Sequence, residues 1–136
     1  MTLPPLPATK NKREAKWSTT VLRKWWLMKK IPGPFEVKYA TGASLPFSAV
    51  AEHQLLALLA CMSDEGFLWK IPDMGQRNPF DFIYYRNSPA WIVIKYPLGF
   101  CVISARAFEL EMKRSVRRSL LWTRAREICT YDSKSG

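Results

Sequence analysis

Residues 91–96 constrain the fold of this chain more than any other segment. They read Trp-Ile-Val-Ile-Lys-Tyr, and only Lys95 interrupts the apolar run. Side chains of a strand alternate between the two faces of a sheet, so a strand with one wet face would alternate apolar and polar residues. The segment therefore predicts a central strand that is apolar on both faces.

The segments around this strand alternate between helical and extended patterns. Residues 13–30 place apolar side chains three and four positions apart, as on one face of a helix, although Glu14 lies at the leading end of that stripe. We also predict helices over 48–62, capped by Ser48, and over 119–128, strands over 35–40, 67–71, 80–85 and 100–104, and a polar loop over 41–46. This order predicts an α/β fold with a mixed sheet flanked by helices, not a bundle or a sandwich.

The length of 136 residues corresponds to one ordinary domain. We expect a flexible arm over residues 1–11, a single folded domain over 12–129, and a flexible tail over 130–136. Hydrophobic residues make up 48% of the chain, which is enough for a core.

The formal net charge is +10, from 21 Lys and Arg against 11 Asp and Glu. Eight basic residues lie within 10–30 and seven within 106–126, whereas the middle of the chain is nearly balanced. Two basic flanks favour a polyanionic partner, and we expect nucleic acid. An ordinary soluble basic protein is the alternative. A membrane surface is disfavoured because the core needs the Trp and Leu residues of the candidate helices.

The cysteines Cys61, Cys101 and Cys129 are far apart in the sequence, and His53 is the one histidine. This spacing argues against a structural zinc site. Cys61 and Cys101 lie among apolar residues, which predicts buried free thiols in a reducing compartment. No secretory signal or membrane span is recognisable, so we expect a cytoplasmic protein, in the host cell cytoplasm if the chain is viral.

The sequence Phe-Glu-Val-Lys at 35–38 contains an E-x-K triplet within a predicted strand. Residues two apart in a strand share a face, so Glu36 and Lys38 should stand side by side. A carboxylate can hold a divalent cation, and an ammonium can stabilise negative charge or orient a water, as in a metal-dependent nuclease. The alternative is an exposed ion pair on an edge strand, which would contribute little stability.

The triplet is followed by Ser-Leu-Pro-Phe-Ser at 44–48, Glu-His-Gln at 52–54 and Gly-Phe at 66–67. This series resembles the PD-(D/E)XK nuclease superfamily, and within it the Holliday junction resolvases of the RecU-like and archaeal resolvase-like type. The Arg-Arg-Ser-Leu sequence at 117–120 also resembles the C-terminal end of RecU-like proteins, and the segment 78–85 is similar to small phage proteins of this class. The resemblance covers residues 35–126.

The resemblance implies a restriction-endonuclease-like fold and roles for particular residues. Glu36 would bind a catalytic Mg²⁺ or Mn²⁺, and Lys38 would position the attacking water or stabilise the transition state. Gln54 would support the site from its helix. Glu14 matches the place where many members keep a helical glutamate near the metal.

One departure from the family pattern concerns the aspartate that normally precedes the E-x-K strand. No aspartate occurs here before Asp64. Asp81, which follows a proline-bearing loop and opens a predicted strand, is the first candidate for the missing metal ligand, and Asp73 is the second. Either a later residue supplies this oxygen ligand, as in a permuted site that pairs Asp81 with Glu36 and Lys38, or activity is lost. A turn-capping role is the alternative for Asp81.

The resemblance and the charge together predict a Mg²⁺-dependent endonuclease that cuts branched DNA such as Holliday junctions. Symmetric cutting needs two active sites, so we expect a homodimer, with Trp25, Trp26 or Trp122 as candidates for its interface. The residues expected to hold phosphates are Lys12, Arg13, Lys16, Lys95, Arg114, Arg117 and Arg118. The alternatives are a non-catalytic DNA-binding protein on the same fold, acting in recombination or packaging, and a small scaffold that binds RNA or a protein.

Overall fold

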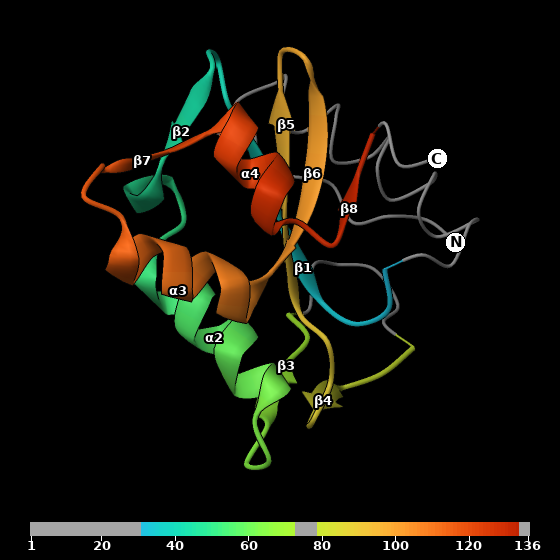
Figure 1. Cartoon of the computed structure of the whole chain (residues 1–136). Helices are drawn as coiled ribbons and strands as arrows, with labels where there is room; N and C mark the ends of the chain where they lie inside the picture. Colours follow the sequence, from blue (N-terminus) through green and yellow to red (C-terminus); the bar gives the residue numbers. More distant parts are fainter. Residues whose placement is uncertain (1–30, 73–78, 134–136) are drawn as a thin grey trace.

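The computed structural model describes residues 31–72 and 79–133, and its centre is a four-stranded mixed sheet (Figure 1). The strands run in the order β1, β5, β6, β8, where β1 is parallel to β5 and the other neighbours are antiparallel. Their bounds are Phe35–Tyr39 for β1, Trp91–Tyr96 for β5, Gly99–Ser104 for β6 and Tyr131–Asp132 for β8. The predicted α/β class with a mixed sheet is confirmed. The arm and the first helix, predicted over 1–11 and 13–30, lie outside the described residues.

The strand β5 is buried on both faces, as its sequence predicts. Ile92, Ile94 and Tyr96 belong to the core on one face of the sheet. Trp91 and Val93 belong to a second core on the other face. All five residues are less than a tenth exposed, so β5 anchors both cores.

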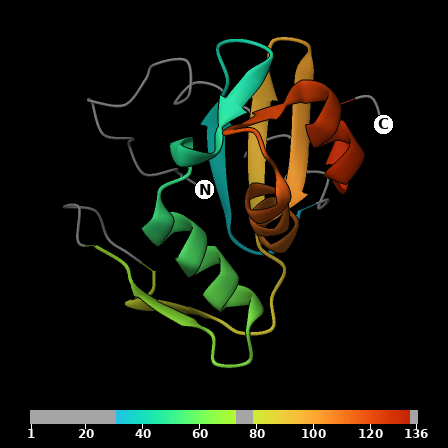
Figure 2. The same cartoon turned by 60° about the vertical axis from the view of Figure 1, so that its left-hand side comes forward.

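Three helices cover the first of these faces (Figures 1 and 2). They are α2 (Glu52–Met62), α3 (Ala105–Arg114) and α4 (Trp122–Ile128). The sequence does not predict α3, which begins after Ser104, whose Oγ accepts a hydrogen bond from the backbone N–H of Ala107 at 3.1 Å. Within 31–72 and 79–133, no helix is long and apolar enough to cross a membrane.

Two small antiparallel sheets accompany the main sheet. Strand β2 (Ser44–Pro46) pairs with β7 (Ser119–Leu121), and β3 (Phe67–Lys70) pairs with β4 (Phe82–Tyr85). The predicted loop over 41–46 thus contains a strand, and the predicted helix over 119–128 begins only at Trp122. The tail predicted from residue 130 contains β8, which pairs with β6. Strands β2, β7 and β8 depend on partners far away in the sequence, and no local pattern predicts them.

The start of α2 also differs from the prediction. A 3₁₀ turn, η1 (Phe47–Ala49), precedes the helix, and Ala51 rather than Ser48 is its N-cap. The Oε1 atom of Gln54 accepts a hydrogen bond from the backbone N–H of Ala51 at 3.2 Å. This bond satisfies a backbone donor at a place where a helix cannot satisfy it internally.

The cysteines agree with their prediction. Cys61 and Cys101 are buried free thiols, and Cys129 is a partly buried free thiol. Burial is the main cause that raises the pKa of all three thiols. Raised pKa values keep these side chains protonated and poorly nucleophilic, as expected of cysteines that serve packing.

Trp122, a candidate for the dimer interface, has a packing role instead. It is buried, and its ring lies 5.3 Å from that of Tyr96, measured between centroids. It therefore leaves no apolar surface for a partner, and the prediction for this residue is wrong. The other two candidates, Trp25 and Trp26, are not among the described residues.

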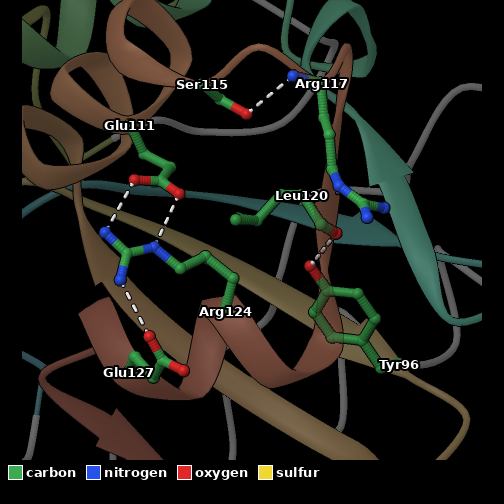
Figure 3. Close-up of polar contacts among 7 residues, drawn as sticks. All are labelled: Tyr96, Glu111, Ser115, Arg117, Leu120, Arg124 and Glu127. Atoms are coloured by element: carbon green, nitrogen blue, oxygen red, sulfur yellow. Dashed lines mark hydrogen bonds and ion pairs between the residues drawn. The ribbon is translucent and has the colours of Figure 1, made fainter.

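The buried hydroxyl of Tyr96 provides a test of this packing. It donates a hydrogen bond to the backbone carbonyl of Leu120 at 2.9 Å, which ties β5 to β7 (Figure 3). We expect Tyr96→Phe to lower the free energy of unfolding by about 1 to 2 kcal/mol, because the buried carbonyl loses its donor. Urea denaturation measures the change.

The matched control is Tyr84→Phe. The Tyr84 hydroxyl donates a similar bond, at 2.7 Å, to the carbonyl of Glu65, but that bond is exposed and water can replace it. Its loss should change stability by less than about 0.5 kcal/mol. Equal effects of the two variants would contradict the role of burial.

Candidate active site around Glu36 and Lys38

The E-x-K triplet occupies β1, and its two charged side chains are paired. The Nζ atom of Lys38 lies 3.3 Å from Oε1 of Glu36. In the register with β5, Glu36 is the partner of Ile92 and Lys38 is the partner of Ile94. Both therefore point to the face that the three helices cover, and the prediction that they share a face is confirmed.

The pair is largely withdrawn from water. The side chain of Lys38 is 10% exposed and that of Glu36 is 27% exposed. Within the described part of the chain, Lys38 is the one charged residue that is buried. The alternative of an exposed surface ion pair is therefore wrong, although β1 does lie at an edge of the sheet as that alternative supposed.

A buried ammonium at this position needs a reason other than stability. Removing a charge from water costs several kcal/mol, and one partly exposed carboxylate offsets only part of that cost. The neighbouring strand uses Ile92 and Ile94 on the same face, and an apolar residue at 38 would pack there without this cost. The chain thus keeps a charged group at the border of its core, as functional sites commonly do.

Gln54 lies at the start of α2, and α2 is one of the helices that cover the sheet face on which Glu36 and Lys38 lie. It is partly buried, and its Oε1 is occupied by the cap of the helix. The turn η1, which leads into this helix, contacts the basic segment before β7, because the N–H of Phe47 donates to the carbonyl of Arg118 at 3.0 Å. The start of α2 and a basic loop are thus neighbours.

That basic loop joins α3 to β7 and carries Arg117 and Arg118, and the last turn of α3 before it carries Lys113 and Arg114; all four residues are exposed. Lys113 is paired with Glu109 at 3.5 Å. For the three arginines, no salt bridge is found with any residue in 31–72 or 79–133. Their charges are thus available to a polyanion.

A network that sequence reasoning missed holds this loop in place (Figure 3). Arg124 of α4 makes a bidentate pair with Glu111 of α3, at 2.7 and 3.0 Å, and a third bond to Glu127 at 2.8 Å. The pKa of Glu111 is lowered, chiefly by its hydrogen bond from Arg124. In the loop itself, the N–H of Arg117 donates to Oγ of Ser115 at 3.1 Å. The spacing of Arg124 and Glu127 on one helix was a visible signal, whereas Glu111 is recognisable only in the fold.

Asp81 does not lie on the main sheet that carries Glu36 and Lys38. It is exposed, directly precedes β4, and belongs to the hairpin with β3, where its carbonyl accepts from the N–H of Ile71 at 2.9 Å. Among the residues described, no group of three His, Cys, Asp or Glu side chains could hold a metal ion. Asp81 lies beside a strand of the β3–β4 sheet, whereas Glu36 lies on β1 of the main sheet, and the predicted sharing of a metal by these two carboxylates stays a prediction. Glu14 and Asp73 lie outside the described residues.

Lys95 lies on the opposite face of the sheet from Lys38. Its register partner on β1 is Tyr39, one residue further along the strand than Lys38, so its side chain points the other way. Its Nζ donates to the neighbouring carbonyl of Tyr96 at 2.6 Å. A polyanion bound at the Glu36 face would not reach it. The basic residues expected at 12, 13 and 16 are outside the described ranges.

Comparisons with protein-family models, with curated proteins and with solved structures find no match to this chain. What the protein does is therefore inferred from its own residues. The paired Glu36 and Lys38, the start of α2 and the basic loop are the features on which that inference depends.

The cost of burying Lys38 can be measured by removing either partner of the pair. We expect Glu36→Gln to lower the free energy of unfolding by about 1 to 3 kcal/mol, because Lys38 loses its counter-charge while staying buried. Lys38→Met keeps the length of the side chain and removes the charge, so stability should change by less than about 1 kcal/mol. Chemical denaturation of both variants gives the two values. The opposite ranking would show that Lys38 is solvated and that its charge costs nothing.

Proposed function

We propose that this protein is a Mg²⁺-dependent endonuclease with a restriction-endonuclease-like sheet, which cuts branched DNA such as four-way junctions. The observation that carries the proposal is the burial of Lys38 beside Glu36 on β1. A lysine kept at the border of a core, next to a carboxylate, supplies the pair of charges that phosphodiester hydrolysis uses.

The chemistry follows from what each side chain can do. The Nζ of Lys38 carries a positive charge in a region of low exposure, where it acts more strongly on nearby negative charge than it would in water. It would stabilise the charge that develops on the phosphate oxygens, or hold the attacking water by a hydrogen bond. The carboxylate of Glu36 fixes the ammonium at 3.3 Å and limits its motion.

The described residues supply only part of a metal site. Glu36 is the candidate ligand beside Lys38, and carboxylate oxygens are the ligands that Mg²⁺ prefers. When bound, the metal would stabilise negative charge on the phosphate and lower the pKa of a bound water. Further ligands would have to come from outside the described residues, and Glu14 is the one that the family pattern suggests.

The basic loop is the candidate contact for DNA phosphates. Arg114 at the end of α3 and Arg117 and Arg118 in the loop are exposed, and the loop is fixed by the bond from Phe47 and by the pairing of Arg124 with Glu111. Arginines on a pre-ordered loop bind phosphate with a smaller loss of side-chain freedom than arginines on a mobile one.

A second candidate function is a non-catalytic DNA-binding protein on the same fold, acting in recombination or packaging. The lack of a three-ligand group in the described part of the chain favours it. This alternative needs the basic loop but makes no use of Lys38.

Incubation of a labelled four-way junction and a matched duplex with the protein separates the two functions. We expect cleavage of the junction in the presence of Mg²⁺. We expect Lys38→Met to slow that cleavage by roughly 100-fold or more, the usual effect of losing one charge-stabilising group, while junction affinity stays within a few-fold. Binding of the junction without any cleavage, in Mg²⁺ and in Mn²⁺, would instead establish the non-catalytic alternative.

The contribution of the basic loop is visible in the salt dependence of binding. Each phosphate contact contributes about 0.9 to the slope of log affinity against log salt, so the Arg117→Ala, Arg118→Ala double variant should reduce the slope by roughly 2. Arg86→Ala is the control, because Arg86 is paired with Asp64 at 3.3 Å on the hairpin side of the molecule. An unchanged slope in the double variant would exclude the loop as the DNA contact.

A further inference from the structure

Two of the three cysteines lie against each other where α4 ends beside β6. Cys101 of β6 is fully buried in the core between the sheet and the helices, and Cys129, the C-cap of α4, packs against that same core. Both are free thiols, and their side chains are hydrogen-bonded to each other. The two residues are far apart in the sequence, so it is the fold that brings their sulfur atoms together.

The backbone holds the two cysteines in this position. The N–H of Thr130 donates to the carbonyl of Val102 at 2.9 Å, so the residues that directly follow the two cysteines are joined. A little further on, Asp132 of β8 is the register partner of Cys101 itself. Figure 1 shows the same path, in which the chain leaves α4 beside β6 and turns into β8. Because a disulfide forms without strain only where the main chains already hold the two sulfur atoms close together, this pairing favours a bridge.

The two thiols differ in their access to solvent and in their ionisation. Cys101 is fully buried, whereas Cys129 is partly exposed. Burial is the main cause that raises the pKa of Cys129, and the charge of Asp132 adds to it, but the hydrogen bond with Cys101 acts in the opposite direction. For Cys101, burial and the neighbouring Cys129 both raise the pKa. Cys129 is thus the thiol that an external reagent reaches and the one that ionises first.

We propose that Cys101 and Cys129 form a reversible disulfide that ties the end of α4 to β6, with a low-molecular-weight disulfide such as oxidised glutathione as the oxidant. In the first step the thiolate of Cys129 attacks one sulfur of the oxidant, the S–S bond of the oxidant breaks, and one glutathione thiolate leaves. In the second step the sulfur of Cys101 attacks the sulfur of Cys129 and displaces the second glutathione thiolate. The two cysteine protons pass to these leaving groups, so the protein loses two electrons and the oxidant gains them.

The bridge acts on the C-terminal part of the fold. It encloses α3, the basic loop, β7 and α4, and it fixes the chain just before β8, a strand of two residues. In the reduced protein, β8 is held by its pairing with β6 and by the salt bridge of Arg126 with Asp132 at 3.3 Å. A cross-link removes conformations from the unfolded chain, so the oxidised protein should be the more stable form.

The rate of bridge formation follows from the same environment. Both pKa values are raised, so little thiolate is present near neutral pH and the exchange should be slow. Rapid redox sensors use exposed cysteines of low pKa, which this pair does not provide. The bridge is thus a slow stabilising lock. It involves neither DNA nor metal, so it is independent of the proposed nuclease activity.

Oxidation of the native full chain tests the proposal. The chain is incubated with about 5 mM oxidised glutathione at about pH 8.5, alkylated in denaturant and analysed by mass spectrometry. We expect the wild-type chain to keep one alkylatable thiol, that of Cys61, and to yield a cross-linked peptide pair that contains Cys101 and Cys129. The melting temperature of the oxidised chain should exceed that of the reduced chain by roughly 5 °C or more, and dithiothreitol should reverse both changes.

Single variants test the order of the two steps. Cys101→Ala removes the second sulfur, so glutathione should stay attached to Cys129 as a mixed disulfide. Cys129→Ser should leave Cys101 reduced, because the folded chain shields it from the oxidant. Cys61→Ala is the control and should form the bridge at an unchanged rate. Far-ultraviolet circular dichroism confirms that each variant is folded.

Three results would overturn the proposal. The first is a wild-type chain that keeps all three thiols, or that carries a stable mixed disulfide at Cys129. The second is a bridge to Cys61 that forms as readily as the bridge between Cys101 and Cys129. The third is an oxidised chain that melts no higher than the reduced one, because the bond would then distort the native fold.

Discussion

The burial of β5 on both faces is the constraint on which the rest of the structure depends. Its side chains alternate between two cores, so apolar residues must be supplied from both sides of the sheet. On one side they come from α2, α3 and α4. The positions of these helices are therefore set by the need to cover this face of the sheet. Strand β1 lies parallel to β5, and this pairing decides that Glu36 and Lys38 face the helices rather than the other core.

This arrangement directs the side chain of Lys38 toward an apolar core, which is an unfavourable place for a charge. Its register partner is Ile94, which is fully buried, so any residue at 38 is drawn toward the core. Because β1 is an edge strand, Glu36 beside it keeps some contact with water and can balance the charge. A lysine here is tolerable only at an edge, and an edge is also where a substrate can approach. The same geometry thus accounts for the tolerance of the charge and is compatible with the role proposed for it.

The parts that the sequence predicts are those determined by local periodicity. Alternation is sufficient to recognise β5 and to place Glu36 beside Lys38, because both depend on residues one or two apart. The helix α2 was also recognised, but not its start, because the competing η1 turn and the cap from Gln54 depend on the exact backbone path. Strands β2, β7 and β8 are two or three residues long and are made by pairing with distant segments. The sheet to which the strand after Asp81 belongs was not predictable for a related reason, because a motif spacing carries no information about which sheet a strand will join.

The described surface separates into regions of different chemistry, and this separation supports distinct roles. The loop between α3 and β7 is cationic and is held rigid by Arg124, Glu111 and the bond to η1. The hairpin of β3 and β4 is neutral, aromatic and anchored only at one end. Helix α2 contacts both regions, through η1 at its start and through the hairpin at its end. The hairpin packs at the end of α2 opposite Gln54, so one helix of eleven residues connects the two regions, and a shift of the hairpin would be passed to the basic loop through that helix.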